Sequence, residues 1–299
     1  MRPLPSSPAA VFLAFVAALL AAMLGAALLS PWVQATVAPI AVLPLHRVFA
    51  RLTMLGVLAG AVWLLLRHGL ARGAVLGYVG PVPRFLRRAL LGLAAGVLMM
   101  AATLLPLFWL RVLVWSAAVP VACSGWLVLA AHGLGTGLMV ALIEETFFRG
   151  AMQGALQRMG ATGWALFAVP LLYAVVHFLG RPVGIAEAAE PRGGFAALGQ
   201  FLSRLAHPFA ILDAFVALWC VGVLLALVRR RWGDLAGCIG LHAGFVATIT
   251  VFRKVSSPAA HGDWSFLVGS FDGLLGWWIA VLAGLACLLV RPSGRDLRA

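Results

Sequence analysis

Two adjacent carboxylates stand out because of where they lie. Glu144 and Glu145 follow the apolar residues 137–143, and no acidic residue precedes them in the chain. A carboxylate at membrane depth costs about 2.5–3.5 kcal/mol on insertion scales, so such residues normally face the interior of a helix bundle and mark an ionic, proton-handling or catalytic site. The pair is therefore the first candidate for chemistry.

Helical spacing gives the two carboxylates different surroundings. Glu145 and Arg149 are four residues apart with the acid N-terminal to the base, which is the favourable order for an ion pair. Glu144 projects about 100° away around the helix, and its neighbour four residues on is the apolar Phe148. Glu144 is therefore the candidate general base, and Glu145 is its orienting neighbour.

Two histidines, His177 and His242, lie inside apolar runs, whereas the other five lie near loops or helix ends. A single buried histidine is more often a hydrogen-bonded core residue than a catalyst. Two of them, combined with the Glu pair, favour acid–base chemistry. A proton relay in a transporter would use the same residue types, but no inverted repeat or pair of broken helices supports that alternative.

These residues resemble the motifs of the CAAX-protease-and-bacteriocin-processing family of intramembrane proteases, which includes the Ras-converting enzyme. The resemblance extends over about 135–250. The Glu-Glu-x-x-x-Arg motif is complete, Phe-x-x-x-His has Tyr in place of Phe, and His-x-x-x-Asn/Asp has Val at its last position. The corresponding residues are Glu144, Glu145 and Arg149; Tyr173 and His177; and His242 and Val246.

The resemblance implies an intramembrane endopeptidase that hydrolyses a peptide bond in a membrane-anchored substrate, such as a lipidated or C-terminal sorting segment. It implies that Glu144 and His177 activate water and that His242 stabilises the oxyanion. Val246 cannot donate the second hydrogen bond that Asn gives in family members, and the sequence contains no Asn. Loss of one such donor cost roughly 100–1000-fold in another hydrolase. The alternative is therefore a non-catalytic membrane scaffold or a bacteriocin-immunity protein.

The resemblance leaves the use of a metal open, because members have been described both as metalloproteases and as glutamate proteases. Glu144, His177 and His242 would make a three-ligand zinc site with one open position. The adjacent Glu pair suits water activation without a metal equally well. Zinc is thus the one candidate cofactor. The sequence contains no His-Glu-x-x-His, Gly-x-Gly-Asp or Gly-x-Ser-Gly motif of other protease classes.

Composition defines the elements that must position these residues. The chain of 299 residues is 63% hydrophobic and 10% charged, with a mean hydropathy of +1.04. A bilayer core of ~30 Å takes about twenty apolar residues per helix, and the sequence offers many such runs. We therefore predict an all-α, polytopic transmembrane bundle of about eight helices. The net charge of +13 comes from arginines between the runs, which indicates topology rather than nucleic-acid binding.

Nine apolar runs are candidate helices. If the arginine clusters at 84–88, 229–231 and 291–298 are all cytoplasmic, the five runs between the first two clusters cannot all cross. One of the five is therefore partial or re-entrant, and the candidates are the run that contains Pro120 and the run that contains the Glu pair. The nine runs are 9–30, 48–66, 89–110, 112–131, 135–157, 163–180, 209–228, 233–252 and 271–290.

The runs group into three regions. Residues 1–132 form N-terminal transmembrane helices. Residues 133–252 form the catalytic helix core with an interfacial loop at 180–208, in which 195–205 is a candidate amphipathic helix. Residues 253–299 form a loop, the last transmembrane helix and a basic tail. The expected partners are the lipid bilayer and a membrane-embedded peptide substrate, and the expected location is a bacterial inner membrane with a cytoplasmic C-terminus.

Glycine pairs four residues apart recur along the chain and would let helix backbones approach closely. The four cysteines lie in apolar runs without a Cys-x-x-Cys pair, so they are predicted to be packing residues. The glycine pairs are Gly56/Gly60, Gly92/Gly96, Gly133/Gly137, Gly150/Gly154 and Gly240/Gly244.

Overall fold

The computed structural model describes residues 7–38, 43–116, 122–179, 193–259, 264–269 and 271–290, and helices account for most of them. Its two strands, β1 and β2, contain three residues each and pair antiparallel. The helices are α1 (Pro8–Val37), α2 (Leu45–Arg67), α3 (Gly73–Leu76), α4 (Val82–Trp109), α5 (Cys123–Glu145), the π-helix η1 (Thr146–Met152), α6 (Gln153–Arg158), α7 (Thr162–His177), α8 (Gly193–Ser203), the 3-10 helices η2 (Arg204–Ala206) and η3 (Pro208–Ile211), α9 (Leu212–Trp232), α10 (Ala236–Val255), the 3-10 helix η4 (Ser265–Leu267) and α11 (Trp277–Leu289); the strands are β1 (Leu113–Trp115) and β2 (Ser256–Pro258).

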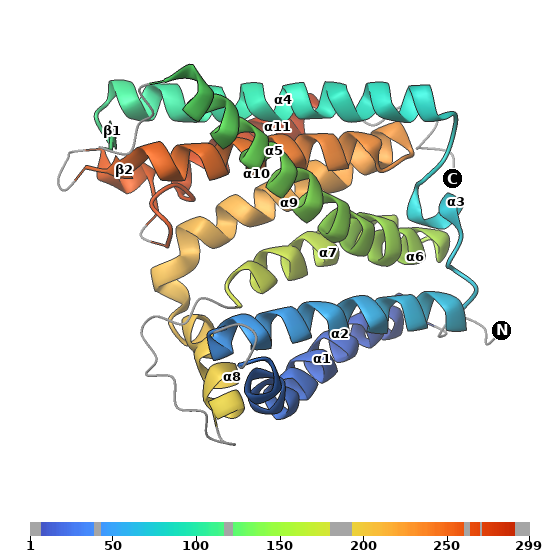
Figure 1. Ribbon diagram of the computed structural model, residues 1–299. Coiled ribbons are helices and arrows are strands. Elements are labelled where there is room, and N and C mark those ends of the chain that lie inside the picture. Colours follow the sequence, from blue (N-terminus) through green and yellow to red (C-terminus); the bar gives the residue numbers. More distant parts are fainter. Residues whose placement is uncertain are drawn as a thin grey trace.

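The described chain contains six helical segments that are long and apolar enough to cross a membrane, and α7 and α11 are shorter apolar helices. Figure 1 shows the long helices running in broadly the same direction as one bundle, with α1 and α2 at one side and α4, α10 and α11 at the other. Large apolar side chains cover the outside, including Trp32, Leu98 and Trp109. The chain is an integral membrane protein, and the predicted polytopic helical fold is confirmed.

One of the nine predicted helices is wrong. In run 112–131 the first residues form β1 rather than a helix, and the last residues begin α5. That helix continues through η1 and α6, so that Cys123–Arg158 is one continuous apolar segment of 36 residues. The physical reason is pairing: β1 lies against β2, with Val114 opposite Ser257, which ties the end of α4 to the end of α10. The run with the Glu pair is therefore part of a helical segment that is long and apolar enough to cross a membrane.

All five predicted glycine pairs lie where backbones meet. Helix α10 lies between α4 and α5, and a Cβ on Gly92 of α4 would be only 2.5 Å from the carbonyl oxygen of Gly237. On the other side, a Cβ on Gly133 of α5 would be 2.8 Å from the carbonyl oxygen of Ala247. Helix α10, which carries His242, is thus held by close backbone contact on two faces.

The predicted amphipathic helix near 195–205 is present as α8. Its buried residues Gly194, Ala197 and Phe201 face α1 and α2 rather than only the membrane surface. Phe201 packs edge-on against Phe49 of α2, with ring centroids 4.7 Å apart. In the rest of the predicted interfacial loop, residues 204–208 include η2 and the first residue of η3, and residues 180–192 lie outside the described residues.

Candidate active site

The two carboxylates lie where one helix type changes to another. Glu144 and Glu145 end α5, and the next seven residues form the π-helix η1, which carries Arg149. A π-helix bonds each residue to the fifth one before it, so its turn is wider than that of an α-helix, and such segments are frequent at functional sites. Sequence spacing had predicted a regular α-helix here.

Glu145 and Arg149 form the predicted ion pair. Their Oε1 and Nη1 atoms are 3.0 Å apart, and both side chains are fully buried. Arg149 also donates from Nη2 to the backbone carbonyl of Gly222 on α9, at 3.0 Å. Its guanidinium carbon lies 4.4 Å from the ring centroid of Tyr173, which adds a cation–π contact. The pair is therefore neutralised and held by two neighbouring helices.

The same carboxylate holds His242. Nδ1 of His242 lies 2.8 Å from Oε1 of Glu145. Because an ionised carboxylate only accepts, Nδ1 carries the hydrogen. The other ring nitrogen, Nε2, faces Glu144 at 3.9 Å. In the neutral ring this Nε2 has a free lone pair, so His242 can donate from Nε2 only when the ring is protonated.

His177 is oriented by its own helix. Its Nδ1 lies 2.7 Å from the backbone carbonyl of Tyr173, one turn earlier in α7. A carbonyl only accepts, so Nδ1 donates and Nε2 of the neutral ring is left as an acceptor. That Nε2 lies 3.8 Å from Oε2 of Glu144. One water could thus donate to both Oε2 of Glu144 and Nε2 of His177, which are 3.8 Å apart, and accept from Nε2 of His242 when that ring is protonated.

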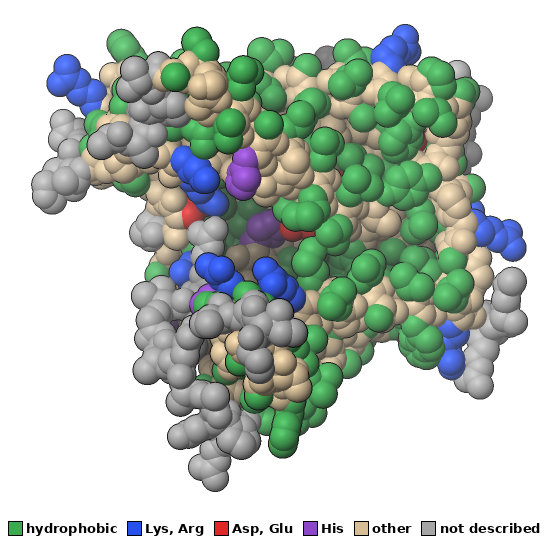
Figure 2. All heavy atoms as spheres, in the orientation of Figure 1, with side chains coloured by type: hydrophobic (Ala, Val, Ile, Leu, Met, Phe, Trp, Pro, Cys, Tyr) green, Lys and Arg blue, Asp and Glu red, His purple; other side chains and the backbone are tan. Residues whose placement is uncertain are grey.

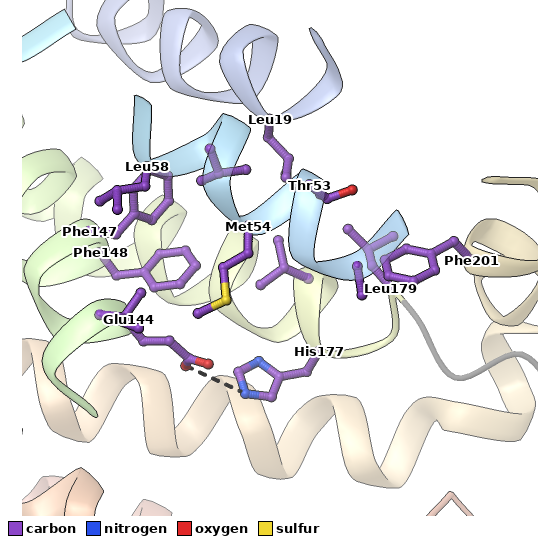
Figure 3. A pocket seen from close by; sticks show the side chains of 14 residues that line it. Leu19, Thr53, Met54, Leu58, Glu144, Phe147, Phe148, His177, Leu179 and Phe201 are labelled. Carbon is purple, nitrogen blue, oxygen red and sulfur yellow. Dashed lines mark ion pairs between the residues drawn. The ribbon is translucent and has the colours of Figure 1, made fainter. Parts of the chain in front are cut away.

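Glu144 and His177 have partly exposed side chains, unlike His242. Their side chains are 29% and 26% exposed, whereas that of His242 is 4% exposed. Both line a cavity of about 330 Å³. Figure 3 shows the Glu144 carboxylate pointing toward the His177 ring, with Met54, Leu58 and other apolar side chains around the remaining space.

The walls of this cavity come from distant parts of the chain. Sequence reasoning had placed α1 and α2 outside the site, and their apolar side chains gave no signal that would single them out. Figure 2 shows a hollow in an otherwise hydrophobic face, with histidine and acidic side chains visible inside it and basic side chains at its rim. Besides Glu144 and His177, the lining residues are Leu19, Ala50, Thr53, Met54, Val57, Leu58, Ile143, Phe147, Phe148, Val176, Leu179 and Phe201.

Tyr173 and Val246, the two residues that complete the family motifs, differ in their positions relative to the site. Tyr173 is buried between the site groups, with its ring centroid 4.4 Å from that of His177 and 6.1 Å from that of His242. Val246 lies one turn beyond His242 on α10, is partly buried and does not line the cavity. Sequence reasoning also missed Gln153, a buried amide four residues after Arg149.

Zinc coordination by the predicted ligands is a separate question from their acid–base geometry. Glu144, His177 and His242 approach one another, but within the described ranges no group of three His, Cys, Asp or Glu side chains has a geometry that could hold a metal ion. Zinc coordination therefore stays a prediction. The acid–base geometry of the same three side chains stands without it.

Comparison with known proteins identifies the domain that contains this site. Residues 125–248 match the family model described as type II CAAX prenyl endopeptidase Rce1-like. The chain therefore carries an Rce1-like domain, and the family resemblance predicted from its motifs is confirmed. The match begins in α5 and ends in α10, so it contains all the predicted site residues. No curated protein and no solved structure gave a significant match.

Proposed function

We propose that the chain is an intramembrane endopeptidase that hydrolyses a peptide bond next to an apolar or lipidated segment of its substrate. The observation that carries the proposal is the approach of Nε2 of His177 and Nε2 of His242 to the Glu144 carboxylate, beside an apolar cavity that Glu144 and His177 line. The name of the matching family supports a prenylated C-terminal segment as the substrate class.

The geometry supports a two-stage hydrolysis. A water held between Glu144 and Nε2 of His177 gives its proton to Glu144 as its oxygen attacks the carbonyl carbon. Protonated His242, held by Glu145, donates from Nε2 to the oxyanion that forms. Protonated Glu144 then returns the proton to the amide nitrogen as the C–N bond breaks, which leaves a new carboxyl group and a new amine.

The expected orientation has the arginine-rich ends of the helices on the cytoplasmic side. Arg84 and Arg87 begin α4, Arg158 ends α6 and Arg229–Arg231 end α9. Figure 1 shows these three ends at one side of the bundle, as the tendency of arginine to remain cytoplasmic requires. The location in a bacterial inner membrane and a cytoplasmic C-terminus stay predictions.

The test is cleavage of a prenylated peptide by the purified chain. Glu144→Gln and His177→Ala should each reduce kcat at least ~100-fold, because general acid–base groups contribute about 10²–10⁴-fold. The melting temperature of each variant in detergent serves as the folding control. A chelator should leave wild-type activity unchanged; abolished activity that zinc restores would replace the metal-free mechanism with a zinc-dependent one. Wild type that cleaves no member of a broad peptide library would favour a non-catalytic scaffold, the reading that Val246 supports.

A further inference from the structure

A column of polar side chains extends away from the site inside the bundle. Glu145, Arg149 and Gln153 occupy every fourth position through α5, η1 and α6, and all three are fully buried. In an α-helix, residues four apart are offset by about 40°. The three side chains nevertheless follow one side of the segment, because Glu145 bonds Arg149, and Arg149 and Gln153 bond carbonyls of the same neighbouring helix, α9.

Helix α9 lies along this column. Arg149 donates to the carbonyl of Gly222 at 3.0 Å, and Gln153 donates from Nε2 to the carbonyl of Ala226 at 3.1 Å. One turn further on α9 comes Arg229, which is 7% exposed and lies against Gly77. The column thus connects the candidate active site with the arginine-rich end of the bundle.

Each member of the column has one buried polar atom without a hydrogen-bond partner among the described residues. These atoms are Oε2 of Glu145, Nε of Arg149, Oε1 of Gln153 and Nε of Arg229. In this order they alternate between acceptor and donor. An unpaired buried polar group costs about 1–3 kcal/mol, and water, which both donates and accepts, is the molecule that usually satisfies such groups inside proteins.

The apolar cavity on the other side of Glu144 makes a separate water route useful. Eleven of its fourteen lining residues are apolar, so a bound apolar substrate segment would displace water from it. Each hydrolysis nevertheless consumes one water at Glu144, whose Oε2 also lacks a hydrogen-bond partner among the described residues.

We propose that ordered waters fill the column formed by Glu145, Arg149, Gln153 and Arg229 and supply the hydrolytic water from the arginine-rich side. The hydration of the column stands on the unpartnered atoms alone. The supply role rests on the proposed endopeptidase function.

Oxidation of the Cys238 thiol can report whether the column contains water. The thiol is fully buried and donates at 3.2 Å to the carbonyl of Leu225, which is next in the chain to Ala226, the residue whose carbonyl Gln153 bonds. A short X-ray pulse generates hydroxyl radicals from water, including water inside a protein, and sulfur side chains oxidise readily. Met23 and Met100, which are 2% and 4% exposed in apolar clusters, are the matched controls.

The full-length protein in detergent is pulsed, and oxidation is measured by mass spectrometry. If the column holds water, Cys238 should be oxidised at least ~10-fold faster than Met23 and Met100. If Cys238 is oxidised as slowly as the two methionines, the column is dry and the proposal is wrong. This readout needs no catalysis, so it also decides the hydration of the column in a chain that cleaves nothing.

The supply role is tested with Gln153→Met, which keeps the side-chain length and removes the amide. Oxidation of Cys238 and kcat should both fall several-fold, with KM unchanged. The control is Thr103→Val, which removes a buried hydroxyl bonded to the carbonyl of Met99 on α4 and should change neither value. Reduced oxidation with unchanged kcat would overturn the supply role while leaving the hydrated column in place.

Discussion

Glu144 and Glu145 are adjacent in the chain, yet the structure gives them opposite environments. Glu145 is fully buried and bonded to Arg149 on one side and His242 on the other. Glu144 is 29% exposed, and the Nε2 atoms of His177 and His242 lie 3.8 and 3.9 Å from its Oε2. Glu145 is thus held between Arg149 and His242, whereas Glu144 is the carboxylate that we propose as the general base.

Removal of the Arg149 charge should expose the structural role of the pair. Arg149→Met keeps the stem but leaves Glu145 fully buried without its cation, and breaking a buried pair in this way costs about 3–5 kcal/mol. We expect a clearly lower melting temperature in detergent and loss of cleavage. Arg87→Met, at an exposed arginine of α4, is the control and should melt like wild type. Equal melting of the Arg149 variant would contradict the structural role.

At the scale of elements, His242 is positioned by the close packing of three helices. Helix α10 contacts α4 through Gly240 and Gly244 and contacts α5 through Gly133 and Gly137. Lipid tails are as apolar as the helix surfaces, so the hydrophobic effect does not drive helices together inside a membrane. Close packing through small residues is what holds them together instead. The distance of His242 from Glu144 and Glu145 therefore depends on glycines that take no part in the chemistry.

A methyl group at Gly240 should disturb this packing. A Cβ there would collide with the carbonyl oxygen of Ala89, so α4 and α10 must separate. Overpacking typically costs 1–3 kcal/mol, and His242 would move with its helix. We expect Gly240→Ala to lower both the melting temperature and kcat. Gly135→Ala on α5, where a Cβ meets no atom within 4 Å, should be neutral or should stabilise by up to ~1 kcal/mol. If Gly240→Ala and Gly135→Ala change the melting temperature and kcat by similar amounts, the packing explanation is wrong.

At the scale of the whole molecule, the cavity joins the Rce1-like domain to helices outside it. Residues of α1, α2 and α8 form one wall, and Glu144 and His177 lie on the other. Figure 3 shows Met54 of α2 extending toward Glu144 from the facing wall. The helices outside residues 125–248 on the N-terminal side therefore shape the space that an apolar substrate segment would occupy.

A bulky residue on the α2 wall should weaken substrate binding more than chemistry. Met54→Trp would occupy part of the 330 Å³ cavity, so KM for a prenylated peptide should rise about tenfold while kcat changes less, as expected for a contact that the ground state and the transition state share. Leu66→Trp, at an exposed position near the end of the same helix, should leave KM unchanged. An unchanged KM in the Met54 variant would place the substrate elsewhere.

The sequence determined the features that depend on composition and on short spacing. Apolar runs predicted the helical membrane fold, and glycine pairs predicted close helix contacts. The spacing of Glu145 and Arg149 predicted their ion pair, because residues four apart on a helix are neighbours whatever the rest of the chain does. The order of three motifs predicted the family.

The tertiary structure decided which faces meet. A helix that is apolar all round has no periodic pattern from which its buried side can be read, so neither the α1 and α2 wall nor the burial of Gln153 against α9 could be predicted. The strand at Leu113–Trp115 likewise depends on a distant partner, because it pairs with β2. The adjacent carboxylates were visible in the sequence, but the approach of two imidazoles to Glu144 and the cavity beside it exist only in the folded bundle.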